Sequence, residues 1–228
     1  MYSLILLNGG VGSRVGADRP KQLLKVKGIP ILVYSLIVAD KTPEITEIVM
    51  NYPEGWLDSV KRIVDDYAIK TPVTYVDAGE TRHESVAAML PHCSNDHVVI
   101  HEAARPLVGQ DDFARLIADP RENVSFMLKI PFTVAPVDPS TQLVTGSLER
   151  DRLRNVQLPQ KFAKASLGDA HALAAKSGAI FTEDATLVAS QGFPVHFMEG
   201  SDENFKVTTP LDLRLASLLL NVDEENYG

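Results

Sequence analysis

The sequence predicts an α/β fold in which a mostly parallel, twisted sheet carries helices on both faces. Short apolar segments with the length of strands alternate with helical patterns along most of the 228 residues, as in parallel βαβ connections. The composition, with 45% hydrophobic and 23% charged residues, is that of a globular protein. No internal repeat or interdomain linker interrupts the pattern. Residues 1–228 are therefore predicted to form a single domain.

The first half of the chain contains four predicted strands. Residues 3–7 are almost wholly apolar, which is typical of a buried strand. Residues 31–39 follow Pro30 and are apolar nearly all round, which predicts a buried helix. Thr81 and Glu84 have the spacing of a capping box, so a helix is expected to begin there. The other strands are predicted at residues 47–51, 73–76 and 98–100, and an amphipathic helix at 54–67.

The second half continues the alternation but contains one irregular segment. Residues 131–158 combine three prolines with alternating polar and apolar residues, which predicts an extended hairpin that protrudes as a β-arm. Gly178 is expected to end the helix that precedes it. The strands of this half are predicted at 124–130 and 194–198, and the helices at 110–118, 167–177, from about 182 onward, and at 210–220.

A glycine-rich turn, followed by cations, comes directly after the first strand. Glycines let backbone N–H groups approach a phosphate because no Cβ blocks them. Arg14, Arg19 and Lys21 add positive charge, and residues 1–39 hold five basic residues and one acidic residue in a chain of net charge −8. This pattern predicts a site for a phosphate-rich ligand. The alternative is a plain glycine turn with solvated cations around it.

The spacing within this turn excludes two common phosphate motifs. Val15 stands where a dinucleotide fingerprint needs its third glycine, and the chain contains no Gly-Lys-Ser or Gly-Lys-Thr for a P-loop. What remains is G-G-x-G-x-R-x5-P-K-Q over Gly9–Gln22. This run resembles the signature of sugar-phosphate and polyol-phosphate nucleotidylyltransferases.

Composition excludes several other classes of protein. The single cysteine, Cys93, allows neither an internal disulfide nor a multi-cysteine metal site. The negative net charge argues against a nucleic-acid partner. No apolar run approaches the roughly 18–20 residues of a membrane-spanning helix, and residues 1–7 lack the features of a signal peptide. A cytoplasmic enzyme without a membrane partner is therefore expected.

Six blocks of motif residues follow one another in order along the chain. They are Gly9–Arg14 with Pro20–Gln22, Asp77–Ser85, His101–Pro106, Arg150 with Pro159–Phe162, Thr182–Ala185, and Glu199–Gly200 with Asn204–Thr208. With these blocks the chain is similar to the CTP-dependent polyol-phosphate cytidylyltransferases, which act on methylerythritol phosphate or ribitol phosphate. The resemblance implies a Rossmann-like nucleotidyltransferase fold, a three-layer sandwich with a protruding arm. It also implies transfer of CMP from CTP to a polyol phosphate with release of pyrophosphate.

The resemblance also implies a role for each matched residue. In-line attack on the α-phosphorus needs charge neutralisation and positioning more than covalent help. The implied catalytic cations are Arg14, Lys21 and Lys206. The implied nucleotide-binding residues are Asn8, Gly9, Gly10, Val11 and Gly12 for the phosphates and Gly79, Glu80 and Ser85 for cytosine. The implied acceptor-binding residues are Glu102, Arg105, Thr133 and Arg150, with Glu102 also nearest to Mg²⁺ or another divalent cation.

Three points stay open at the level of the sequence. Glu102 stands where the family usually has Asp, which leaves room for a non-catalytic nucleotide-binding relative. A sugar-1-phosphate nucleotidylyltransferase that uses another triphosphate is the second alternative. The acceptor is either ribitol 5-phosphate or 2-C-methyl-D-erythritol 4-phosphate. Ribitol 5-phosphate is slightly favoured by Leu158 in place of a threonine, by Trp56, and by the segments 147–154, 78–83 and 199–201. The resemblance further implies a homodimer in which the arm, residues 131–158, reaches across to the partner subunit.

Overall fold

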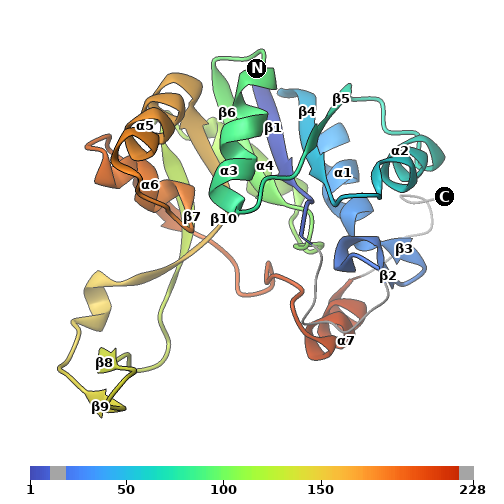
Figure 1. Cartoon of the computed structure of the whole chain (residues 1–228). Helices are drawn as coiled ribbons and strands as arrows, with labels where there is room; N and C mark the ends of the chain where they lie inside the picture. Colours follow the sequence, from blue (N-terminus) through green and yellow to red (C-terminus); the bar gives the residue numbers. More distant parts are fainter. Residues whose placement is uncertain (11–18, 221–228) are drawn as a thin grey trace.

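The computed structural model describes residues 1–10 and 19–220 and confirms the predicted α/β architecture (Figure 1). Seven strands form one sheet in the order β11-β7-β10-β6-β1-β4-β5. Strand β10 is antiparallel to both of its neighbours, β6 and β7, whereas the other adjacent pairs are parallel. The strands are β1 (Tyr2–Leu7), β4 (Ile45–Tyr52), β5 (Val73–Asp77), β6 (His97–Glu102), β7 (Val124–Lys129), β10 (Arg154–Ala163) and β11 (His196–Glu199).

The parallel register places the carboxyl ends of the central strands at one edge of the sheet. Leu7, the last residue of β1, is paired with Glu102, the last residue of β6. Tyr52 at the end of β4 is likewise paired with Asp77 at the end of β5. In open α/β sheets this edge is where ligands bind. The turns that follow β1, β5 and β6 therefore face the same region.

Helices cover both faces of the sheet, and the side chains of β1 show the two layers. Leu4 and Leu6 pack in a buried cluster with α1, α2 and α4, whereas Ile5 and Leu7 pack with α3, α5 and α6. The predicted three-layer sandwich is thus confirmed. The helices are α1 (Ile31–Asp40), α2 (Leu57–Asp66), α3 (Arg82–Met89), α4 (Gln110–Ala118), α5 (Lys164–Ser177), α6 (Asp184–Ser190) and α7 (Pro210–Leu219).

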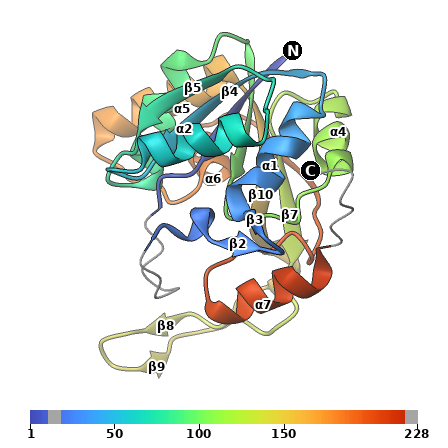
Figure 2. The same cartoon turned by 90° about the vertical axis from the view of Figure 1, so that its right-hand side faces the viewer.

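A third buried cluster joins the segment around residues 26–34 to the C-terminal end of the described chain. The small hairpin of β2 (Lys25–Val26) and β3 (Ile29–Pro30) contributes Val26 and Ile29, and these pack with Ala216 and Leu220 at the end of α7. The side chain of Thr209 caps α7 by accepting a hydrogen bond from the main-chain N–H of Asp212. Helix α7 is therefore fixed beside the segment that follows the glycine-rich turn (Figure 2).

The arm projects away from the body of the molecule and carries the short hairpin of β8 (Val137–Asp138) and β9 (Leu143–Val144) (Figures 1 and 2). Its apolar side chains face solvent, and Phe132 and Val144 are 77% and 69% exposed. The predicted protruding β-arm is confirmed. Within the described residues, this hairpin has no core of its own.

The predicted boundary of the arm at residue 158 is wrong. Strand β10 begins at Arg154, so residues 154–158 belong to the central sheet, and Leu158 is 4% exposed in the core. Pro159 argues against a central strand because proline cannot donate a ladder hydrogen bond. The structure accommodates it at an irregularity between Gln157 and Gln160, where the register shifts against β7.

Two further elements differ slightly from prediction. Helix α6 begins at Asp184 rather than near Thr182, because the carboxylate of Glu183 accepts the N–H of Ala185 and caps the first turn. Helix α5 begins at Lys164, earlier than predicted, and ends as expected at Gly178, which has a φ of 68°. Across residues 1–10 and 19–220, no helix is long and apolar enough to span a membrane.

Candidate active site

A cavity of about 440 Å³ lies at the carboxyl edge of the central strands. The turns after β1, β5 and β6 and the segment before α7 all contribute to it. It gathers eight of the predicted site residues: Gly9, Gly10, Lys21, Gly79, Glu80, Ser85, Glu102 and Lys206. The predicted residues Val11, Gly12 and Arg14 lie outside the described part of the chain.

The turn after β1 is held by buried polar contacts. The N–H of Asn8 donates to Oδ1 of Asn51 over 2.6 Å, and Nε2 of Gln22 donates to the carbonyl of Asn8 over 3.1 Å. The Asn8 side chain is fully buried and is not part of the cavity lining. A Cβ at Gly9 would lie 2.5 Å from Cβ of Ala78. Glycine is therefore required at residue 9 by close packing of two turns.

Two lysines from opposite ends of the chain meet at this cavity. Lys21 begins a 3₁₀ turn (Lys21–Leu23), and its Nζ donates to the carbonyl of Val207 over 2.8 Å. The N–H of Val207 donates to the carbonyl of Ala104, directly after β6. Lys206 is thereby held next to the end of β6. The predicted pairing of Lys21 with Lys206 in one site agrees with this geometry.

Glu102 is a buried carboxylate surrounded by cations. Its Oε1 lies 2.7 Å from Nζ of Lys206, and its Oε2 accepts a hydrogen bond from Nε of Arg105 over 3.1 Å. Burial alone would raise the pKa of Glu102, but Lys206 and Arg105 outweigh it and lower the pKa from 4.5 to about 2. Glu102 is therefore ionised at neutral pH and has both oxygens engaged.

Arg105 does not line the cavity but contacts residues that do. Its Nη1 donates to the carbonyl of Asn204 over 2.8 Å, while its Nε contacts Glu102. It therefore ties the end of β6 to the segment that carries Lys206. Direct contact with an acceptor, as the resemblance implies, stays a prediction for this residue.

The segment before α3 forms the opposite wall of the cavity. The capping box predicted for Thr81 and Glu84 is confirmed, since each side chain accepts the other residue's N–H. The N–H of Gly79 donates to the hydroxyl of Ser85 over 3.1 Å. A Cβ at Gly79 would lie 2.7 Å from Cβ of Glu84 and 2.9 Å from the main-chain nitrogen of Ser85. This wall is therefore shaped by main-chain groups that approach closely.

The comparisons with known proteins agree with this geometry. The sequence model of the 2-C-methyl-D-erythritol 4-phosphate cytidylyltransferase family matches residues 2–222. The chain belongs to this family. It is accordingly a cytidylyltransferase, an enzyme that uses CTP, as the motif blocks had implied.

Similarity extends over the full length of several relatives. The chain is 33% identical to 2-C-methyl-D-erythritol 4-phosphate cytidylyltransferase of Bacillus cytotoxicus, over 97% of this chain and 99% of the relative. The chloroplastic enzyme of that name from Oryza sativa is 33% identical over 96% of this chain and 74% of its own length. The crystal structure of the enzyme from Thermus thermophilus is 30% identical, with a TM-score of 0.75 over 96% of this chain and 98% of that one.

One solved structure matches the fold closely at lower sequence identity. The 4-diphosphocytidyl-2C-methyl-D-erythritol synthase of Anaerococcus prevotii superimposes with a TM-score of 0.83 at 23% identity, over 96% of this chain and 95% of that one. At this identity the match supports the fold alone.

The two arm residues predicted for the acceptor lie outside the cavity of their own chain. Thr133 and Arg150 are both exposed, and Nη1 of Arg150 donates to the carbonyl of Pro131 over 3.3 Å. Arg150 instead lines a smaller hollow at the base of the arm with Lys129 and Arg154. Within one subunit, therefore, the arm does not complete the site.

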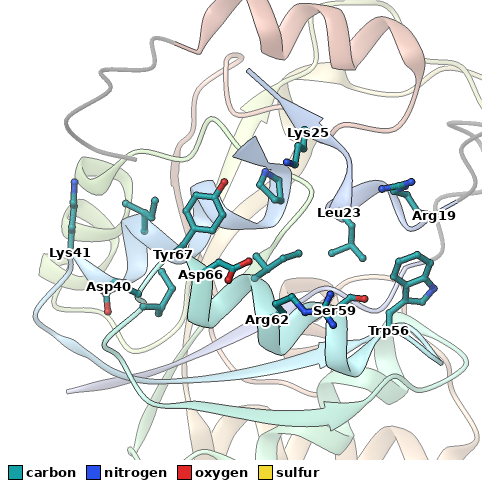
Figure 3. A pocket seen from close by; sticks show the side chains of 15 residues that line it. Arg19, Leu23, Lys25, Asp40, Lys41, Trp56, Ser59, Arg62, Asp66 and Tyr67 are labelled. Carbon is teal, nitrogen blue, oxygen red and sulfur yellow. The ribbon is translucent and has the colours of Figure 1, made fainter. Parts of the chain in front are cut away.

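A larger cavity, of about 660 Å³, lies between α2 and the β2–β3 hairpin (Figure 3). Arg19, Lys25 and Arg62 surround Leu23 there, and Trp56 closes one end. None of the predicted site residues lines it. Although larger, it is lined by none of Lys21, Glu102 and Lys206, so we assign the active site to the smaller cavity.

Sequence reasoning missed Asn51 as a site residue, and it assigned no contacts to Gln22 and Arg82. Asn51 and Gln22 line the cavity and hold the turn after β1. Arg82 also lines it and reaches Asp184, 102 positions along the chain. The Asn51 and Gln22 contacts join segments far apart in sequence, so no local pattern signals them. Gln22, Arg82 and Asp184 all stand in the motif blocks, and membership of these blocks was the available signal.

Proposed function

We propose that this cytidylyltransferase transfers CMP from CTP to 2-C-methyl-D-erythritol 4-phosphate and releases pyrophosphate. The observation that carries the proposal is the meeting of Lys21, Lys206 and Glu102 at one cavity, in a chain matched by the family over residues 2–222. The relatives compared above take their names from this acceptor or its product.

The cations of the cavity suit the proposed chemistry. Attack of the acceptor phosphate on the α-phosphorus builds negative charge around that atom and on the departing pyrophosphate. A preorganised ammonium group stabilises such charge strongly because it needs no reorientation during the reaction. Lys21 is buried and already oriented by Val207, whereas Lys206 is oriented by Glu102. We assign both lysines to the phosphates of the transition state.

Gly79 and Ser85 are proposed to recognise the cytosine base. A pyrimidine ring presents hydrogen-bonding groups along its edge, and main-chain N–H and C=O groups can bind them only at close approach. Gly79 lets its turn pack closely on the start of α3, because a Cβ there would meet Glu84 and Ser85, and its main-chain groups line the cavity. The neighbouring Glu80 also lines the cavity.

Mg²⁺ is the proposed cofactor, with Glu102 as the nearest protein carboxylate. Mg²⁺ keeps several waters and binds mainly to phosphate oxygens, so a single protein carboxylate suits it. Glu102 offers hard oxygen ligands, and its low pKa keeps them charged. When bound, Mg²⁺ would neutralise part of the triphosphate charge.

The arm is proposed to complete the acceptor site across a homodimer. Its exposed apolar residues, Phe132 and Val144 among them, need a partner surface to remove them from water. A two-fold dimer supplies the same surface to both arms. Arg150 can then bind a phosphate through two parallel hydrogen bonds in the partner's cavity, with Thr133 beside it.

Ribitol 5-phosphate is the second candidate acceptor, which Trp56 and Leu158 slightly favoured. Leu158, however, packs in the core and is 4% exposed. Its lack of a hydroxyl group therefore says little about the acceptor. Trp56 lines the larger cavity, so it too lies away from the assigned site. These two residues therefore carry little weight for the choice of acceptor, and the names of the relatives favour methylerythritol phosphate.

Pyrophosphate release with a matrix of substrates tests the proposal. CTP, UTP and ATP are each paired with 2-C-methyl-D-erythritol 4-phosphate, ribitol 5-phosphate and glucose 1-phosphate. We expect turnover with CTP and the methylerythritol acceptor, with kcat/KM at least about tenfold below this value for ribitol 5-phosphate. Faster turnover of ribitol 5-phosphate would reverse the acceptor assignment. Turnover of glucose 1-phosphate with UTP would replace the proposal by the sugar-1-phosphate alternative.

A further inference from the structure

Arg82 occupies the space between the start of α3 and the carboxylate of Glu102. Its Nη1 lies 2.6 Å from Oδ2 of Asp184, its Nη2 lies 3.5 Å from Oε1 of Glu183, and its Nε lies 3.8 Å from Oε1 of Glu102. The side chain is 20% exposed. One guanidinium group thus faces three carboxylates that come from two different parts of the chain.

The oxygen of Glu102 that faces Arg82 is also the one that holds Lys206. Oε1 lies 2.7 Å from Nζ of Lys206 and 3.8 Å from Nε of Arg82, while Oε2 is bonded to Arg105. Arg82 and Lys206 therefore flank a single oxygen atom. Because both oxygens have cationic neighbours, rotation of the carboxylate would break at least one of these contacts.

We propose that Arg82 is a positioning residue for cytidylyl transfer, which fixes the carboxylate of Glu102 and through it the ammonium group of Lys206. Lys206 has a flexible side chain, 38% exposed at the cavity. Its ammonium group donates a hydrogen bond to Glu102. The position of the Glu102 carboxylate therefore determines the position of the Lys206 ammonium group.

The geometry of Arg82 suits this role better than that of a lysine. A guanidinium group presents several N–H donors in a fixed plane, whereas an ammonium group is a single point of charge. Asp184 is 1% exposed, and Arg82 and His171 lower its pKa against the effect of burial. Asp184 fixes Nη1 of Arg82, and in this orientation the Nε of Arg82 faces Glu102.

A purely structural role is the competing explanation. Arg82 joins α3 to the start of α6, and removing one partner of a buried ion pair strongly destabilises a protein. A structural role would lower the amount of folded enzyme. It would not make the turnover of the folded enzyme depend on Glu102. The test must therefore measure coupling between Arg82 and Glu102 in kcat.

The test variant removes both charges of the closest ion pair, as Arg82→Gln with Asp184→Asn, so that neither of these two groups is left charged without the other. Glu183 keeps its hydrogen bond from Gln160. Turnover is measured with radiolabelled CTP on protein that has been shown to be folded. The acceptor is the polyol phosphate that supports the reaction in the substrate test described above. The result thus does not depend on the methylerythritol acceptor. We expect kcat to fall at least about tenfold, with the KM for CTP changed less than about threefold.

A double-mutant cycle then separates the two explanations. In a Glu102→Gln background, the same pair of substitutions should lower kcat by less than about threefold, because the carboxylate that Arg82 positions is already gone. In a Lys21→Arg background the full loss should remain, since Lys21 lies outside the Glu102 contacts. Equal losses in the native and the Glu102→Gln backgrounds, or no loss in the native background, would overturn the proposal.

Two further variants serve as controls. Arg121→Gln with Asp119→Asn removes another Arg–Asp pair, which lies 2.5 Å apart on the turn before β7, and should leave kcat unchanged. Arg82→Lys keeps the charge and loses the planar group, so it should recover only part of the native kcat. Full recovery by lysine would mean that charge alone, and not orientation of Glu102, is what Arg82 supplies.

Discussion

Lys21 donates a hydrogen bond from Nζ to the main-chain carbonyl of Val207 over 2.8 Å, although 186 positions separate the two residues. Lys21 is 7% exposed, so its charge is held inside the wall of the cavity. The residue before Val207 is the second lysine of the site. This hydrogen bond therefore links the two segments that carry the proposed catalytic lysines.

Lys21→Met should lower kcat by at least about a hundredfold, because a preorganised positive charge is lost where negative charge accumulates. Methionine keeps the length and packing of the side chain, so the fold should survive. Lys25→Met is the control, since Lys25 is exposed and lies outside the 440 Å³ cavity. Steady-state kinetics with both substrates measure the effect. Near-normal turnover in the methionine variant would remove Lys21 from the mechanism.

Gly79→Ala should raise the KM for CTP at least about tenfold with a smaller change in kcat. The new Cβ would lie 2.7 Å from Cβ of Glu84, which forces the wall of the nucleobase site to move. Gly109→Ala is the control, because the nearest atom to its Cβ is 3.7 Å away. Nucleotide titration by calorimetry gives the same comparison without acceptor. Unchanged CTP affinity would show that the wall adjusts freely.

Glu102 should make the stability of the protein depend on acid pH. Its pKa in the folded protein, about 2, lies below its ordinary value of 4.5. Its contribution is therefore complete above pH 4.5 and is lost as the pH falls towards 2. Between pH 6 and pH 3 the native protein should lose about 2 kcal/mol more unfolding free energy than Glu102→Gln. Urea unfolding at several pH values measures this difference, and parallel curves would contradict the assignment.

Chelation should abolish turnover. EDTA is expected to remove the proposed Mg²⁺ and stop pyrophosphate release, and excess Mg²⁺ should restore the rate. Glu102→Asp, which shortens the side chain by one methylene, should retain a metal requirement but raise the Mg²⁺ concentration needed for half-maximal rate. Full activity after exhaustive chelation would rule out the cofactor.

Mixed subunits test the shared acceptor site. Arg150→Ala and Lys21→Met are each expected to be inactive alone. In a heterodimer, one cavity would contain an intact Lys21 and receive an intact Arg150 from the other subunit. Random exchange should therefore restore about a quarter of native activity. Sedimentation analysis must first show a dimer that exchanges. A monomeric protein, or subunit exchange without recovered activity, would contradict the proposal that Arg150 serves the partner's cavity.

Local patterns were sufficient to predict most of the fold. The helix at 110–118 has the predicted bounds, and the capping box at Thr81 formed as expected. Strand β10 was the main failure. Its hydrogen bonds join it to β6 and β7, which precede it by more than twenty residues along the chain, and Pro159 hides the strand from any local criterion.

In the candidate site, too, local patterns predicted some features and missed those that depend on long-range packing. Motif spacing brought out Lys21, Gly79, Glu102 and Lys206, which the fold collects at one cavity. What spacing could not show was how these groups contact one another. The contact between Glu102 and Lys206 depends on packing between residues 104 positions apart. The orientation of Arg105 away from the cavity depends on Asn204 for the same reason.

Strand β10 is also the strand from which the arm leaves the body of the molecule. Gln157 donates to the carbonyls of Ser201 and Asn204, and Asn204 donates to the carbonyl of Leu158. The arm and the loop that ends at Lys206 are therefore anchored to the same few residues. In the proposed dimer, a partner subunit that binds the arm would therefore also act on the segment that holds the proposed catalytic Lys206. Binding of substrate at one active site of that dimer would then change the position of Lys206 in the other subunit, so the two sites would be coupled.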